Sequence, residues 1–113
     1  PVYVLIDNNT ISYPELVLLP LKKTGRSTFI GSNTAGAAGF VNKTKITDDI
    51  ILVYTTGTGQ KLSLENNPMS YQGVGIAPDI YVYPTPQGIS EGRDEVLEKA
   101  IELVLNKIEE RKQ

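Results

Sequence analysis

A serine and a glutamate three residues apart follow a short apolar run near the start of the chain, in the order Ser12-Tyr13-Pro14-Glu15. This spacing is typical of a capping box, in which each side chain bonds the other residue's backbone N–H at the start of a helix. A serine where a strand turns into a helix also has the position of a nucleophile, with the Tyr13 N–H holding the oxyanion of the attacked carbonyl. The spacing leaves both interpretations open.

A serine nucleophile needs a base, and the chain has neither histidine nor cysteine. A histidine base must therefore come from outside residues 1–113. The absence of cysteine excludes disulfides, thiolate catalysis and thiolate metal sites, and carboxylates alone rarely bind zinc. The adjacent Asp48 and Asp49 are typical of a solvated turn. We expect no metal and no cofactor.

A second group of residues is the loop from Gly31 to Gly39, which is rich in glycine and alanine. As far as Gly36 its spacing is that of a phosphate-binding loop, but Ala37 stands where such a loop needs lysine. We therefore do not expect nucleotide binding. The loop is either a tight structural turn or a backbone wall of a substrate site.

Composition limits the remaining possibilities. A chain of 113 residues is long enough for one small domain but not for two. Eleven basic and 13 acidic residues give a net charge of −2. No basic stripe is present, so nucleic acid is not an expected partner. No apolar run is long enough for a membrane span. The chain begins at Pro1 and enters a strand at once, which is typical of a piece of a longer protein, and the lack of cysteine suits the bacterial cell envelope or secretion.

The elements that would position Ser12 form a strand–helix–strand unit. The apolar run Val2 to Ile6 predicts a strand buried on both faces, and Ser27 to Ile30 predicts a second strand. Between them we expect a helix from Tyr13 to Lys23, ended by Gly25 and kinked or shortened by Pro20. This spacing favours parallel pairing of the strands and a right-handed crossover.

The rest of the chain predicts a hairpin, a short strand and an amphipathic helix. We expect strands over Ile50 to Tyr54 and Lys61 to Leu64 joined by a turn over Thr55 to Gly59, and a strand over Ile80 to Tyr83. Apolar residues then recur at spacings of three and four from Val96 to Ile108, the stripe of a helix that packs on the sheet. We expect Asp94 to be the N-cap of this helix and Glu95 and Lys99 to form an ion pair on it. Residues 109–113 at its end should fray.

Three stretches together carry a resemblance to a known family. They are Asn9 to Glu15, Ile30 to Gly39, and Gly73 to Ile80 with Gly92 to Ile101 after it. Their order and spacing resemble the C-terminal part of the catalytic domain of the C-terminal processing and tricorn-type serine peptidases. The resemblance covers nearly the whole chain, and the Gly-Ile-Ala-Pro-Asp-Ile stretch ending at Ile80 is its most specific element.

The resemblance implies an α/β fold with a β/β/α core like that of the ClpP and crotonase group, of which residues 1–113 form a single partial domain. It implies that Ser12 is the nucleophile and that the Tyr13 N–H lies in the oxyanion hole, which an upstream glycine N–H completes. The implied substrates are peptides, cleaved near their C-termini, or unfolded proteins. No cofactor is implied.

Two positions depart from the pattern of the family. The processing branch has a lysine after the Thr-x-Gly of the second stretch, and Ala37 stands there. The tricorn branch has an upstream histidine as base and a supporting glutamate, whose position falls near Gln72. A glutamine can orient a neighbour by hydrogen bonding but supplies no charge. The chain therefore resembles either the tricorn branch, with its base outside residues 1–113, or the related retinoid-binding repeats.

Three functions follow as hypotheses. The first is a serine peptidase that forms an acyl-enzyme at Ser12, with residues 1–113 inactive by themselves. The second is a non-catalytic module on the same fold that binds a peptide or an apolar ligand, because Ala37 and Gln72 depart from the catalytic pattern. The third is an acyl-handling enzyme of the crotonase group, which needs no serine nucleophile. An exposed sheet edge at Val2 would favour homo-oligomers.

Overall fold

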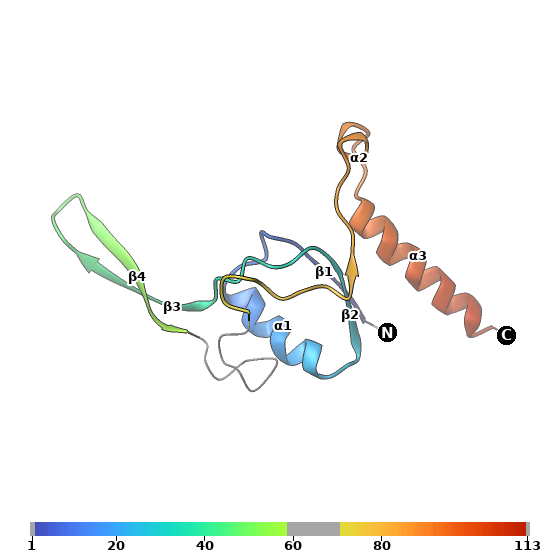
Figure 1. The fold of residues 1–113 in the computed structure, drawn as a ribbon, viewed down its shortest axis with the longest axis horizontal. Coiled ribbons are helices and arrows are strands. Elements are labelled where there is room, and N and C mark those ends of the chain that lie inside the picture. Colours follow the sequence, from blue (N-terminus) through green and yellow to red (C-terminus); the bar gives the residue numbers. More distant parts are fainter. Residues whose placement is uncertain (1, 59–70, 113) are drawn as a thin grey trace.

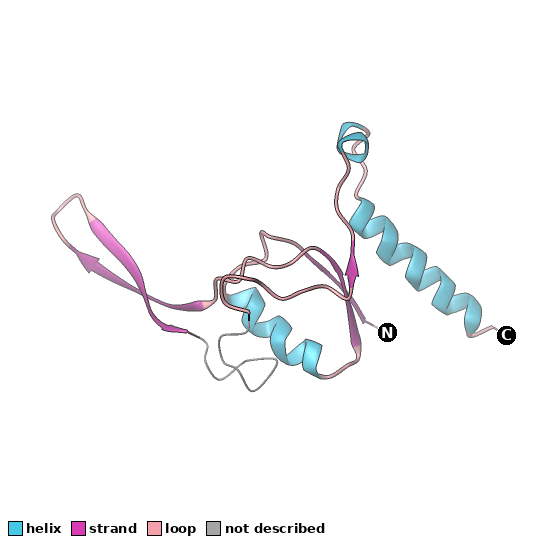
Figure 2. Ribbon diagram, viewed as in Figure 1, coloured by secondary structure: helices cyan, strands magenta, loops and turns pink. Residues whose placement is uncertain are grey.

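A small parallel sheet and a separate hairpin make up the β structure of the described residues (Figures 1 and 2). The computed structural model describes residues 2–58 and 71–112. The elements in order are strand β1 (Val2–Ile6), helix α1 (Tyr13–Lys23), strands β2 (Ser27–Gly31), β3 (Gly39–Lys45), β4 (Ile51–Thr58) and β5 (Ile80–Tyr81), and helices α2 (Pro86–Ser90) and α3 (Glu95–Glu110).

The predicted strand–helix–strand unit is confirmed. Strands β1 and β2 pair in parallel, from Val2 opposite Ser27 to Ile6 opposite Gly31, and β5 pairs in parallel with the other side of β2. Because β2 is central, the side chains of Phe29 and Ile30 are fully buried. Strand β1 is not buried on both faces as we expected, because it forms an edge of the described sheet: Val2 is 51% exposed and Leu5 42%.

Helix α1 has the predicted bounds and continues through Pro20 to Lys23. Pro14 lies in its first turn. The N–H groups of the first turn have no acceptor within the helix, so the missing N–H of proline costs no hydrogen bond there. Leu18 and Leu19 point into a core that also contains Phe29 and Ile76. Helix α1 covers one side of the sheet and α3 lies on the other (Figure 1). The turn that carries Ser12 thus leads from a paired strand into a helix anchored in the core.

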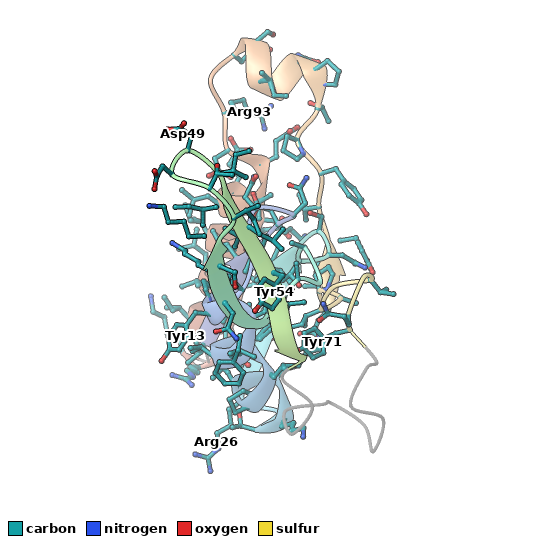
Figure 3. The ribbon with its side chains drawn as sticks, turned by 90° about the vertical axis from the view of Figure 1, so that its left-hand side faces the viewer. Tyr13, Arg26, Asp49, Tyr54, Tyr71 and Arg93 are labelled. Atoms are coloured by element: carbon teal, nitrogen blue, oxygen red, sulfur yellow. The ribbon has the colours of Figure 1, made fainter. Side chains whose placement is uncertain are left out.

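A hairpin of β3 and β4 extends away from the sheet (Figure 1). We did not predict β3, and the turn expected from Thr55 is wrong because β4 continues to Thr58. Threonine is β-branched and favours strands, a preference that outweighed the glycine in this segment. The predicted strand over Lys61 to Leu64 lies outside the described residues. Most apolar side chains of the hairpin are exposed, among them Tyr54, which Figure 3 labels.

Helix α3 begins as predicted, because Asp94 Oδ1 accepts the Leu97 N–H at 2.9 Å. The expected pair of Glu95 with Lys99 is wrong. The Lys99 ammonium pairs with Glu102 at 2.8 Å, and Glu95 accepts hydrogen bonds from Thr85. The apolar stripe of α3 packs on β1 and β2 where Ala100 is buried and Val96 is half-buried, and Leu97, Ile101, Val104 and Ile108 are exposed.

Candidate functional site

Ser12 has a backbone conformation that L-residues rarely adopt. Its φ is 67° and its ψ is −121°, and it is the only residue other than glycine with a positive φ among those the structure describes. Such a conformation costs free energy and persists only where the surroundings hold it, which is common at active sites. The sharp strand-to-helix turn that exposes a nucleophilic serine in hydrolases has this character.

The turn before Ser12 is fixed by hydrogen bonds of its own. Asp7 Oδ1 accepts the N–H groups of Asn9 and Thr10 at 3.0 and 3.1 Å. The Asn9 side-chain amide contributes most to a pKa of Asp7 that lies below its ordinary value, so the carboxylate stays charged. The Thr10 carbonyl oxygen then accepts the Ala35 N–H at 3.0 Å. The approach to Ser12 is therefore tied to the loop after β2.

At the start of α1 one backbone donor remains free. The Ser12 carbonyl oxygen accepts the N–H groups of Glu15 and Leu16 at 3.0 and 3.4 Å, and Pro14 has no N–H. The Tyr13 N–H has no hydrogen bond to any described residue, and the Tyr13 side chain is 73% exposed. In Figure 3 this side chain lies at the outside of the ribbon. The free N–H of Tyr13 belongs to the peptide group directly after Ser12.

The capping box that the sequence suggested is present at the start of α1. Both of its residues are in place, and Glu15 Oε2 accepts the Ser12 N–H at 3.0 Å. The Ser12 hydroxyl makes no cap hydrogen bond, because the Glu15 N–H donates to the Ser12 carbonyl oxygen. The two interpretations of Ser12 competed for its hydroxyl, and in this geometry the hydroxyl has no side-chain cap hydrogen bond.

Glu15 makes more hydrogen bonds than any other side chain of the site, although its spacing from Ser12 predicted only a capping role. Its carboxylate is 0% exposed. Oε1 accepts the Thr34 hydroxyl at 2.6 Å and the Gly36 N–H at 2.7 Å, and Oε2 accepts the Ala37 N–H at 3.0 Å. A signal for this was present, since Glu15 precedes Leu18 and Leu19 by three and four residues and so shares their buried face.

The loop of Gly36 and Ala37 has no free donors for a substrate, because both N–H groups point to Glu15. A backbone wall of a substrate site, the second interpretation of this loop, would therefore have to use groups other than these two N–H donors. Ala37 carries no amine, and within the described chain no lysine or arginine forms a salt bridge with Glu15. The side chain that would activate a serine through an ammonium is absent from this position.

A second loop covers the first. The Thr34 hydroxyl accepts the Ile76 N–H at 2.8 Å, and the Gly73 N–H donates to the Gly36 carbonyl oxygen at 2.8 Å. Tyr71 is buried beside them, and its burial, with a smaller contribution from the negative charge of Glu15, raises its pKa. Figure 3 labels Tyr71 near the end of the described hairpin. The two loops thus form one unit around Glu15.

Gln72, the residue that we placed near the supporting glutamate of the tricorn branch, lies in this second loop. Its Oε1 atom is buried and has no hydrogen-bond partner among the residues that the structure describes. Buried polar atoms without a partner are rare. As an amide it supplies a hydrogen-bond acceptor and no charge.

The stretch that carried most of the resemblance has a structural role. Asp79 Oδ2 accepts the Phe29 N–H at 2.7 Å and Oδ1 accepts Lys22 Nζ at 3.0 Å. Burial alone would raise the pKa of Asp79, but the hydrogen bond from Phe29 and the charge of Lys22 outweigh it and lower that pKa. Asp79 therefore joins β2, α1 and the chain before β5, and the described structure gives it no contact with Ser12.

Two cavities of about 580 and 930 Å³ open where the parallel strands end, both lined in part by Asp7 and Ser32. Ser12 lines neither of them. No cluster of possible metal ligands occurs in residues 2–58 and 71–112, and Asp48 pairs with Lys45 at 2.7 Å. None of the described helices is long and apolar enough to cross a membrane.

Comparisons with solved structures place the fold. The tricorn protease superposes on 95% of this chain with a TM-score of 0.82 and 17% sequence identity, and the chain covers 10% of it. A candidate peptidase of Parabacteroides merdae superposes on 93% with a TM-score of 0.58 and 24% identity, and the chain covers 32% of it. The α/β fold of the ClpP and crotonase type that the resemblance implied is confirmed.

Sequence comparisons give the family. A protein of Chlamydia pneumoniae is 31% identical over 93 residues, which are 82% of this chain and 15% of that protein. An uncharacterized transcriptional regulatory protein of Schizosaccharomyces pombe is 38% identical over 65 residues, and this chain covers 13% of its length. The chain thus spans about a seventh of the curated relatives that it matches. Because the model of peptidase family S41 matches residues 1–82, which include Ser12 and Glu15, the chain belongs to that family.

Proposed function

We propose that this chain supplies the nucleophile of a serine peptidase. The supporting observation is the combination at Ser12 of a positive φ, a hydroxyl without a cap hydrogen bond and a free N–H on the next residue. A capping serine needs none of these features. A nucleophile needs the hydroxyl to face the substrate and a donor beside it for the oxyanion.

The proposed reaction proceeds through an acyl-enzyme. Ser12 Oγ attacks the carbonyl carbon of a peptide bond while its proton passes to a base, and the Tyr13 N–H donates to the oxyanion. The C–N bond then breaks, and the amine leaves with the proton from the base. Water, activated by the same base, attacks the ester and frees Ser12.

The base lies outside residues 1–113 in this proposal. The chain has no histidine, and Ala37 offers no amine in its place. Without a base the Ser12 hydroxyl stays protonated and weakly nucleophilic. Residues 1–113 by themselves are therefore inactive, and we assign to the complete protein a histidine base, as in the tricorn branch. In it the unpartnered Oε1 of Gln72 accepts a hydrogen bond from a neighbouring group of the site.

The substrate class is a peptide or an unfolded protein, cleaved near the C-terminus. Two features of the fold support a larger assembly around residues 1–113, a single partial domain in this proposal. The outer edge of β1 has no partner strand among the described residues, and the hairpin of β3 and β4 exposes apolar side chains. Either surface suits a further segment of the same protein or a second copy in a homo-oligomer.

A second function, a non-catalytic module that binds peptides, is favoured by Ala37 and Gln72, since neither supplies charge. Hydrolysis of an unfolded protein by the complete protein separates the two. A peptidase cleaves it, and Ser12→Ala abolishes cleavage while substrate binding persists. A binding module retains the substrate on a column without cleaving it, in the wild type and in Ser12→Ala alike. That outcome would contradict the peptidase.

A further inference from the structure

Glu15 presents an unusual arrangement of charge. Its carboxylate is fully buried, and within the described residues it has four hydrogen-bond donors and no cation. Burying a carboxylate is costly unless its oxygens are fully hydrogen-bonded. An apolar side chain on this face of α1, like those of Leu18 and Leu19, would avoid that cost. A side chain that served packing alone would make none of these four hydrogen bonds.

One of the four donors is the N–H of Ser12 itself. The other side of Ser12 is also held, because its carbonyl oxygen accepts the N–H groups of Glu15 and Leu16. The peptide groups before and after Ser12 are thus both fixed, and these two groups define its φ and ψ. The carboxylate of Glu15 fixes the first of them, and the backbone of the same residue helps to fix the second.

We propose that Glu15 is the positioning residue of Ser12, an inference that rests on the proposed nucleophile. The ψ of Ser12 sets the direction of the Tyr13 N–H, because both belong to the peptide group between the two residues. A Ser12 that relaxes to negative φ therefore turns its own Oγ and the oxyanion donor away together. Glu15 prevents this relaxation and touches neither the substrate nor the reacting atoms.

The remaining donors explain why the position needs a carboxylate. Oε1 and Oε2 each accept two hydrogen bonds, one pair from Thr34 and Gly36 and the other from Ser12 and Ala37. A glutamine has the same shape but replaces one oxygen by an NH₂ group. That group would face either the N–H groups of Ser12 and Ala37 or the N–H of Gly36. One half of the network then loses its acceptor whichever way the amide turns.

The test compares Glu15→Gln with Asp79→Asn in the complete protein. Both variants convert a carboxylate that accepts a backbone N–H into an amide, but Asp79 holds Phe29 and Lys22 rather than Ser12. We expect Glu15→Gln to lower kcat by about 100-fold with KM changed less than about threefold, a loss comparable to that of one oxyanion donor. We expect Asp79→Asn to lower Tm while kcat stays within about twofold of wild type.

The labelling rate of Ser12 by a fluorophosphonate should fall in parallel with kcat in Glu15→Gln. If the wild-type protein is not labelled at Ser12, Ser12 is not the nucleophile, and the positioning role of Glu15 fails as well. Wild-type labelling with an unchanged rate in Glu15→Gln would overturn the positioning role alone. An equal loss of kcat in Asp79→Asn would also overturn it, because the effect would then follow general destabilisation.

A second pair of variants serves if Glu15→Gln does not fold. Thr34→Val removes one donor to Glu15, and with it the acceptor of the Ile76 N–H, at nearly constant volume, and Thr34→Ser keeps both hydrogen bonds. We expect kcat to fall by about fivefold to tenfold in Thr34→Val, because the hydrogen bond that fixes Glu15 is lost, and to recover in Thr34→Ser. Equal activity of the two variants would contradict the inference.

Discussion

The Ile76 N–H donates to the Thr34 hydroxyl at 2.8 Å, and this hydroxyl donates in turn to Glu15 at 2.6 Å. A short chain of hydrogen bonds therefore runs from the second loop, through the first, to the carboxylate that holds Ser12. Each hydrogen bond in this chain restricts the position of both residues that it joins. The conformation of Ser12 therefore depends on Ile76, which lies more than 60 positions away along the chain.

Close approach of the two loops predicts different responses from two neighbouring glycines. Gly73 and Gly75 both have positive φ, but a Cβ at Gly73 meets nothing within 4 Å, whereas one at Gly75 would lie 2.0 Å from the Thr34 carbonyl oxygen. We expect Gly73→Ala to cost about 1 kcal/mol from backbone strain and Gly75→Ala at least about 4 kcal/mol. Urea denaturation measures both, and equal losses would show that the loops do not touch here.

Acid should weaken the anchor at Asp79. Because its pKa is lower in the folded protein than its ordinary value of 3.8, its carboxylate stabilises the fold above that value and loses this effect as the pH falls through the folded pKa. We expect the free energy of unfolding to drop below about pH 4, and less steeply in Asp79→Asn. Urea denaturation at a series of pH values tests this.

The control for the acid experiment is Asp48→Asn, which removes the same charge from a side chain that is 95% exposed. Its acid slope should match that of the wild type. If Asp79→Asn also keeps the wild-type slope, the hydrogen bond to Phe29 and the ion pair with Lys22 do not stabilise the charged form.

The corner between α2 and α3 gives a third prediction. Glu95 accepts both the N–H and the hydroxyl of Thr85, whereas Lys99 makes only a surface pair with Glu102. We expect Glu95→Ala to cost about 2 kcal/mol and Lys99→Ala less than about 0.5 kcal/mol. Thermal unfolding of the two variants measures the difference. A larger loss in Lys99→Ala would favour the pairing of Glu95 with Lys99 that we first expected.

The strand–helix–strand unit could be predicted from sequence because its signals are local. The apolar run from Val2 to Ile6, the run from Ser27 to Ile30, and Gly25 after α1 each act within a few residues. Asp94 could be recognised as an N-cap for the same reason. The β3 strand could not, because polar and apolar residues mix along it and its pairing with β4 is a contact across a loop.

The candidate site could be predicted only in part. Ser12 and Tyr13 were identified from their place between a strand and a helix, and they remain proposals. The positive φ of Ser12 has no sequence signal, since glycine is the residue that usually marks such a conformation. The bonds of Glu15 to Thr34, Gly36 and Ala37 span about 20 residues and arise from tertiary packing. The spacing of Ser12 and Glu15 at the start of the helix therefore predicted only the hydrogen bond between these two residues.

The central claim is that Ser12 is the nucleophile, and the site of a covalent adduct tests it most directly. The complete protein would be treated with a fluorophosphonate, digested and mapped by mass spectrometry, beside Ser12→Ala and residues 1–113 alone. We predict a single adduct on the peptide that contains Ser12, none in Ser12→Ala, and none on residues 1–113 alone, which have no histidine. An adduct on another serine, or equal labelling of the wild type and Ser12→Ala, would contradict the account.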